Sequence, residues 1–342
     1  MANDVFVLGA GFSKAIHTDM PLLGGLGTEV LKRLGVSRPL HVPDRLDLGD
    51  FEGWLSVLAD EQPWRTEAEN LEARATYLKI TGIMRTVLLE RVRQARLAPC
   101  PDWLLRIVSR WHRDEAAVIT LNYDPLVEAA FAEAARLAGG EWTNDTSHAQ
   151  VYPKPMTPTA SVRGAVFGAT QVRTLKLLKL HGSLNWLYSG RSSFYGETIY
   201  DDSVIRSWAP APSEEYGDAA DKVPLIVPPT VGKSGFFENE SVRAQWRSAF
   251  VALRGASQVF CLGYSLPQGD LLLKNLLTAG VSAGSQIAPV DISRDTFVRY
   301  ETVFGANTTS AFIKDDEPIA HFVELYDGGV GVWDRSFPYR AS

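Results

Sequence analysis

Short runs of apolar residues alternate along the chain with stretches in which apolar positions recur at helical spacing. The runs that predict strands cover residues 5–8, 117–121, 175–180, 225–227, 259–262, 287–291 and 311–313. Most are continuous in Val, Ile and Leu, as in parallel strands covered by helices on both faces, although Lys176 and Lys179 interrupt the third. Helices are predicted over residues 124–138, 242–254, 271–278 and 318–325. The alternation predicts an α/β fold with a Rossmann-like, doubly wound, mostly parallel sheet.

Three insertions interrupt this pattern in what we expect to be a single domain spanning residues 1–342. Residues 40–113 predict a helical insertion, because several of its apolar residues fall at helical spacing: Leu71, Ala75, Leu78, Val87, Leu88 and Val92. Residues 139–173 are rich in Pro, Thr, Gly and Ala, and residues 189–223 carry scattered aromatic side chains, so both predict irregular insertions.

The composition is that of an ordinary globular protein, with 342 residues, 45% hydrophobic and 22% charged. No apolar run is long enough to span a membrane, and the N-terminus lacks the basic region of a signal peptide, so we expect a cytoplasmic protein without membrane contact. The formal net charge is −6 and the basic residues are scattered, which predicts no strong direct binding of nucleic acid.

The only cysteines are Cys100 and Cys261. They could pair in principle, but free thiols are expected in the cytoplasm. Two cysteines without a cluster of histidines cannot form a four-ligand structural zinc site, so we expect no metal.

The first apolar run leads into a glycine-containing turn that opens a helix: Gly9, Ala10, Gly11, Phe12 and Ser13. Gly9 permits a tight turn, and Gly11 would let the main chain approach a pyrophosphate closely. The following helix would offer N–H groups and Ser13 a hydroxyl. Because Lys14 occupies the place of the third glycine of the dinucleotide fingerprint, a purely structural turn is the alternative.

Polar residues follow two further runs, with Asn122 and Asp124 after residues 117–121 and His181 after residues 175–180. Ligands of open α/β sheets bind outside the carboxyl ends of the strands, so these residues and the glycine turn should share one edge. Asp124 could instead cap a helix, and His181 could be a hydrogen-bonded turn residue.

The strands predicted at residues 259–262 and 287–291 also end in candidate binding residues. Gly263, Tyr264 and Ser265 again combine a glycine suited to close approach with a hydroxyl. Asp291 could accept a hydrogen bond from a ribose hydroxyl, or else cap the following helix.

The segments that carry Gly9 to Ser13, Asn122 and Asp124, His181, and Gly263 to Ser265 follow one another along the chain in the same order as motifs of the sirtuin family. They resemble specifically the sirtuin-like NAD hydrolases of bacterial antiphage defence. The resemblance covers residues 4 to 327 without the insertions. It implies that NAD is the substrate and that nicotinamide and ADP-ribose are released. The binding residues it implies are Gly9 to Ser13, Gly263 to Ser265 and Asp291. Asn122 would orient the ribose or a water molecule, His181 would serve as general base, and Asp124 would support Asn122.

Two departures from the family bear on the reaction. Sirtuin deacylases carry two pairs of zinc-binding cysteines, which this chain lacks, and Met20, Pro21 and Leu22 stand where those enzymes have a Phe-Arg pair. Deacylation is therefore disfavoured. Transfer of ADP-ribose to another acceptor and nucleotide sensing without turnover remain as alternatives.

The resemblance also implies control by assembly, because an unregulated NAD hydrolase would harm its host. We expect a homo-oligomer, a partner defence protein such as an Argonaute-like protein or a ring ATPase, or both. Trp54, Trp64 and Trp208 in the insertions are candidate contact residues, and their alternative role is in the core.

Overall fold

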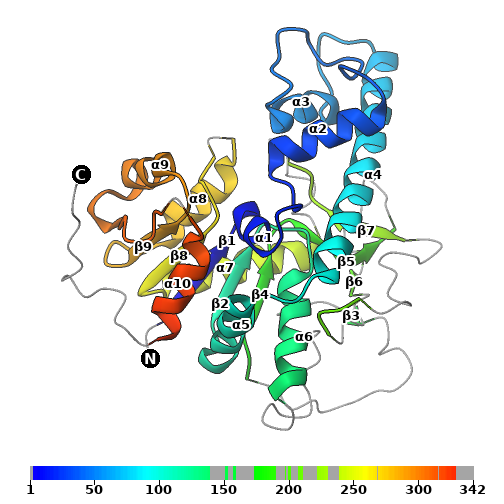
Figure 1. The fold of residues 1–342 in the computed structure, drawn as a ribbon. Coiled ribbons are helices and arrows are strands. Elements are labelled where there is room, and N and C mark those ends of the chain that lie inside the picture. Colours follow the sequence, from blue (N-terminus) through cyan, green and yellow to red (C-terminus); the bar gives the residue numbers. More distant parts are fainter. Residues whose placement is uncertain are drawn as a thin grey trace.

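The computed structural model describes residues 3–138, 151–152, 157–158, 173–189, 197, 199–201, 207–210, 222–229, 239–267, 269–314 and 316–328. Its centre is a five-stranded sheet in the order β4-β2-β1-β8-β9, in which every neighbouring pair is parallel (Figure 1). The strands are β1 (Asp4–Leu8), β2 (Ala117–Thr120), β4 (Lys176–Lys179), β8 (Gln258–Leu262) and β9 (Gln286–Val290). The strand order reverses at β1, which confirms the predicted Rossmann-like, doubly wound α/β fold.

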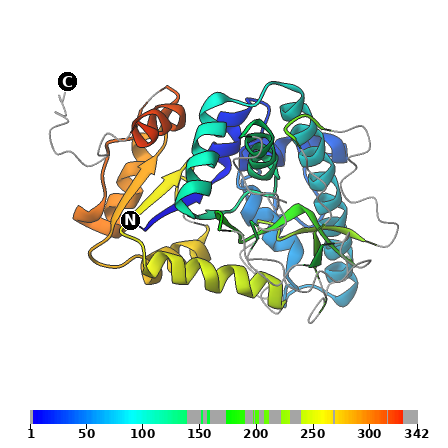
Figure 2. The ribbon, with the colours of Figure 1, turned by 90° about the horizontal axis from the view of Figure 1, so that it is seen from below.

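Helices cover both faces of this sheet, as the view from below shows (Figure 2). On one face, Phe6 and Leu8 of β1 belong to a core that includes side chains of α1 (Ala10–Ile16), α5 (Asp102–Asp114), α6 (Leu126–Ala138) and α10 (Pro318–Asp327). On the other, Val5 and Val7 share a core with α7 (Glu240–Arg254), α8 (Leu271–Gly280) and α9 (Arg294–Phe304). Successive strand residues point to opposite faces, so a continuous apolar run is needed to fill both cores.

A second, mixed sheet lies beside the first, in the order β3-β6-β5-β7. It consists of β3 (Thr157–Pro158), β5 (Gly182–Tyr188), β6 (Tyr200–Asp201) and β7 (Val223–Ile226). The run at residues 225–227 therefore contributes to a strand that pairs antiparallel with β5, outside the parallel sheet. Sequence reasoning missed β5 because its buried polar residues Ser183 and Asn185 interrupt the apolar pattern.

The predicted strand at residues 311–313 is wrong. A helical turn, η5 (Gly305–Asn307), follows α9, and beyond it two isolated bridges, Thr308 to Ile287 and Ile313 to Asp291, stand in place of a strand ladder. The apolar run there is too short to form a ladder with β9.

The helices α2 (Leu23–Leu34), α3 (Phe51–Ala59) and α4 (Glu67–Leu97) pack together into a helical lobe (Figure 1). A capping box between Thr66 and Glu69 starts α4. The helix α5, inside the predicted insertion, packs instead against α6 and α10.

The first half of α4 buries a different face from the predicted one. Leu71 and Leu78 are 64% and 53% exposed, whereas Ala73, Tyr77 and Ile80 are buried. Both sets have helical spacing, and the positions of α2 and α3 decide which is covered. In the second half, Val87, Leu88 and Val92 are buried as predicted.

Trp54 and Trp208 are buried, so they belong to the core, while Trp64 is 76% exposed. Cys100 and Cys261 are free thiols. Most of the two irregular insertions, residues 139–173 and 189–223, lies outside the described residues. Among the helices that the structure describes, none is long and apolar enough to cross a membrane.

Candidate functional site

A cavity of about 830 Å³ lies at the carboxyl ends of the parallel strands, where the strand order reverses. Ligands of doubly wound sheets bind at this position. Every predicted site residue except Phe12 lines the cavity: Gly9, Ala10, Gly11, Ser13, Asn122, Asp124, His181, Gly263, Tyr264, Ser265 and Asp291. The fold thus brings together residues from separate strand ends.

The glycines of the first turn serve contacts within the protein. The Gly11 N–H donates to the Gly263 carbonyl and the Phe12 N–H to the Gly9 carbonyl, both across 2.9 Å. A Cβ on Gly11 would lie 2.8 Å from the Gly263 Cα, so Gly11 allows the turns after β1 and β8 to pack closely together. Gly263 itself has φ +61°, and a Cβ there would lie 2.3 Å from the Phe12 nitrogen. Gly11 also lines the cavity, so its expected approach to a pyrophosphate stays a prediction.

Phe12 is part of the hydrophobic core instead of the cavity wall. Its ring makes an edge contact with Trp103 at 5.5 Å between centroids and lies 6.2 Å from the Trp111 ring. As a side chain of α1 it faces away from the cavity, toward α5, because neighbouring positions of a helix point in different directions.

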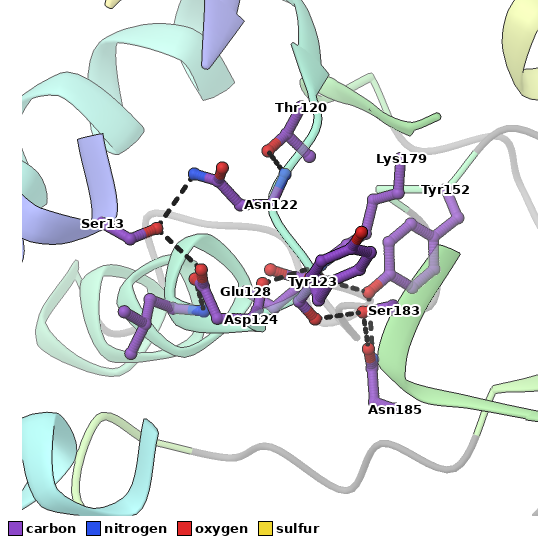
Figure 3. A network of polar contacts seen from close by, with 11 residues as sticks. Ser13, Thr120, Asn122, Tyr123, Asp124, Glu128, Tyr152, Lys179, Ser183 and Asn185 are labelled. Carbon is purple, nitrogen blue, oxygen red and sulfur yellow. Dashed lines mark hydrogen bonds and ion pairs between the residues drawn. The ribbon is translucent and has the colours of Figure 1, made fainter. Parts of the chain in front are cut away.

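A hydrogen-bonded network joins the ends of β1 and β2 (Figure 3). The Asn122 side-chain amide donates to the Gly9 carbonyl across 2.8 Å and to the Ser13 hydroxyl across 2.9 Å. Ser13 in turn donates to Oδ2 of Asp124 across 2.7 Å. These contacts use both N–H groups of the amide, so the group that Asn122 can offer a ligand is its acceptor oxygen, Oδ1.

Asp124 is buried, and two bonds hold its carboxylate. Besides the bond from Ser13, Oδ1 accepts the main-chain N–H of Leu126 across 3.2 Å, which gives Asp124 the helix-capping role considered above as well. Burial raises the pKa of Asp124, and the nearby Lys179 ammonium and the Ser13 hydrogen bond only partly offset this effect.

His181 lies where the chain leaves the parallel sheet and enters the second one. Its ring packs between those of Tyr123 and Trp246, with centroid distances of 6.5 and 6.2 Å. Its carbonyl accepts the Val227 N–H across 2.9 Å, and the Tyr123 hydroxyl donates to the Val227 carbonyl across 2.7 Å. The imidazole therefore occupies a fixed position on the cavity wall, on the same side as the Asn122 segment.

The turns after β8 and β9 form another part of the cavity. The Tyr264 hydroxyl donates to Asp270 across 3.1 Å, and Arg299 Nε donates to the Ser265 carbonyl across 2.7 Å. Asp291 accepts the Ser293 N–H across 2.9 Å at the start of α9, so it also has the local role considered above. Burial raises the pKa of Asp291.

The structure adds charged residues that the sequence did not indicate. Among the described residues that line the cavity, the positively charged Lys and Arg side chains are those of Lys14 and Arg299. Glu52, only 8% exposed, reaches the wall from α3 of the helical lobe. No pattern near Glu52 could have revealed this, because the packing of the lobe against the sheet brings it there.

In the part of the chain that the structure describes, no group of three or more His, Cys, Asp or Glu side chains could hold a metal ion.

No protein-family model and no curated protein matches the sequence. Among solved structures, the chain is similar to one described as "Sir2-p53 peptide-NAD+", with 15% identity, 96% of this chain and 93% of that chain covered, and a TM-score of 0.43. It is also similar to a "Sir2 homolog-NAD complex", with 12% identity, 95% and 91% covered, and a TM-score of 0.46.

Proposed function

We propose that the chain binds NAD in this cavity and hydrolyses its nicotinamide–ribose bond to give nicotinamide and ADP-ribose. One observation carries the proposal: Asn122, Asp124 and His181 line the same cavity as Ser265, Arg299 and Asp291, whose side chains are suited to phosphates and ribose. The sirtuin-like motifs support the choice of NAD.

The reaction would need few protein groups. Cleavage leaves the electron pair of the glycosidic bond on the nicotinamide nitrogen, and water forms the new bond to the ribosyl carbon while losing a proton. Because both N–H groups of Asn122 are engaged, its Oδ1 would accept a hydrogen bond from the water or a ribose hydroxyl. His181 would take the proton, since a histidine titrates near neutral pH.

The binding part of the site would lie toward β8 and β9. The hydroxyl of Ser265 and the guanidinium of Arg299 are suited to the diphosphate, and the carboxylate of Asp291 to a ribose hydroxyl. In this arrangement, affinity and turnover depend on different residues, so mutations can separate them.

We further propose an effector role in antiphage defence, by NAD depletion in the cytoplasm, with activity controlled by homo-oligomerisation or by a partner such as an Argonaute-like protein or a ring ATPase. This part rests on the family resemblance. The exposed Trp64 is a candidate contact residue.

The test is incubation with NAD followed by chromatography of the products, with and without genomically neighbouring proteins, paired with an ADP-ribose binding titration. Equal amounts of free nicotinamide and ADP-ribose are expected. Label transfer from NAD to a macromolecule would instead identify an ADP-ribosyltransferase. Binding without nicotinamide release under every condition would identify a sensing module.

A further inference from the structure

We propose that Lys179 is a positioning residue that holds the segment of residues 122–124 in place beside His181; the inference rests on the proposed function. Lys179 ends β4, two positions before His181, and its side chain is fully buried. Its ammonium donates to the main-chain carbonyl of Asp124 across 2.8 Å and pairs with Glu128 across 2.9 Å (Figure 3). One side chain thus links the two segments that bear the proposed catalytic groups.

The same network continues into the second sheet. The Glu128 oxygen that binds Lys179 also accepts the Tyr152 hydroxyl across 2.5 Å, and the Asn185 amide donates to Tyr152 across 3.0 Å. The Ser183 hydroxyl shares its one proton between Oδ1 of Asn185 and the Tyr123 carbonyl, the latter across 3.2 Å. Side-chain donors therefore reach the main-chain carbonyls of both residues that follow Asn122.

Stability alone gives little reason for this arrangement. Bringing two charges out of water is costly, and apolar side chains of similar volume often replace a buried ion pair without loss of stability. Moreover, Glu128 Oε2 is buried and makes no hydrogen bond within the part of the chain that the structure describes. What the pair does provide is a fixed direction, because an ammonium with two specific acceptors tolerates little displacement of either.

The unusual position of Lys179 is also visible in the sequence. Lys179 interrupts an apolar strand run at a position whose side chain enters the core, where a leucine or valine would be ordinary. Burial of this charge costs desolvation energy, and the compensating contact is to the Asp124 carbonyl, beside the proposed site.

The test uses the double variant Lys179→Met/Glu128→Gln. It removes both charges together, so neither remains unpaired, and Gln keeps an acceptor for Tyr152. We expect faster amide hydrogen exchange in residues 121–126 and a kcat for nicotinamide release at least about tenfold lower, since small misplacement of reacting groups is costly. KM for NAD and ADP-ribose affinity should change by less than about threefold, because the binding residues are untouched.

The matched control is Leu253→Ala on α7, which creates a cavity in the opposite core and touches no part of the network. It should lower the melting temperature while leaving kcat and exchange in residues 121–126 unchanged. If the double variant does not fold, Lys179→Met/Glu128→Met replaces it, since Met at position 128 also removes the buried polar atom that corresponds to Oε2 of Glu128. Failure of both variants to fold would overturn the proposal, because the pair would then be a requirement of the fold itself.

The outcomes separate this inference from the proposed function. If wild type releases no nicotinamide under any condition, the proposed function fails, and exchange in residues 121–126 still decides whether Lys179 holds the segment. Wild-type kcat in the folded double variant would overturn the inference and leave the hydrolase intact. A loss of kcat without faster exchange would also overturn it, since Lys179 would then act by another route.

Discussion

The hydroxyl of Ser13 donates to the carboxylate of Asp124 across 2.7 Å, joining residues 111 positions apart in the sequence. The bond connects the first helix after β1 to the segment that follows β2, and Asn122 completes the link by donating to Ser13. Because the three side chains share partners, the effects of replacing them should not be additive.

Replacement of Asn122 or His181 by Ala should abolish most turnover while sparing affinity. Loss of a positioned general base typically lowers the rate by about 10²–10⁴, and loss of correct orientation can cost about 10². The measurement is nicotinamide release under conditions that activate wild type, alongside an ADP-ribose titration and circular dichroism. Full activity of a folded His181→Ala variant would show that the imidazole is only structural.

Replacement of Asp124 by Asn should change how stability depends on pH. Burial raises the pKa of Asp124 above its ordinary value of 3.8, so the folded state favours the protonated carboxyl. This contribution is fully present below that value and is lost as pH rises through the higher folded-state pKa. The melting temperature of Asp124→Asn relative to wild type should therefore increase as pH rises from about 4 toward neutrality. A difference that stays constant across a calorimetric pH series would contradict the assignment.

Gly263→Ala should destabilise the fold by about 2–4 kcal/mol, through left-handed strain and overpacking. The reason is its φ of +61° and the 2.3 Å separation between an added Cβ and the Phe12 nitrogen. Gly284→Ala is the control, because no atom lies within 4 Å of its added Cβ. Chemical denaturation of both variants gives the comparison. Equal stabilities would show that the two turns can move apart.

Arg299→Gln should weaken ADP-ribose binding by about tenfold, the effect of losing one charge-assisted hydrogen bond, and adenosine binding much less. Calorimetric titration of both ligands makes the comparison. Lys14→Gln tests the other cation of the described cavity wall. A smaller effect is expected, because the ammonium has two N–H groups left beside its bond to the Thr18 carbonyl, whereas the guanidinium has three left beside its bonds to Ser265 and Thr296. Equal losses for ADP-ribose and adenosine with Arg299→Gln would place the guanidinium away from the diphosphate.

Neither cysteine should react with a thiol reagent in the native protein at neutral pH. Burial raises the pKa of both the Cys100 and Cys261 thiols to about 12, so the reactive thiolate is scarce. Titration with a chromogenic disulfide should detect both thiols only in denaturant. Rapid native labelling of Cys261 would reveal opening of the sheet near β8.

Much of the parallel sheet could be predicted, because each strand is a local apolar run and each site segment directly follows one. Parallel strands place their carboxyl ends at one edge, so the pattern of strands was enough to expect Asn122, His181 and the glycine turn at the same edge. The same logic failed for β5, whose buried Ser183 and Asn185 conceal a strand. It also failed for the first half of α4, where Leu71 and Ala73 fit equally periodic faces.

The sequence by itself determined the doubly wound sheet and the set of polar residues at its edge, since both follow from patterns within a few neighbouring residues. Only the tertiary structure decided what those residues contact. It showed that Gly263 fills the space beside Gly11, that the Asn122 amide is committed to Gly9 and Ser13, and that Lys179 pairs with Glu128. Such contacts depend on close packing between distant segments, and small differences in that packing, which no local pattern records, decide which atoms meet.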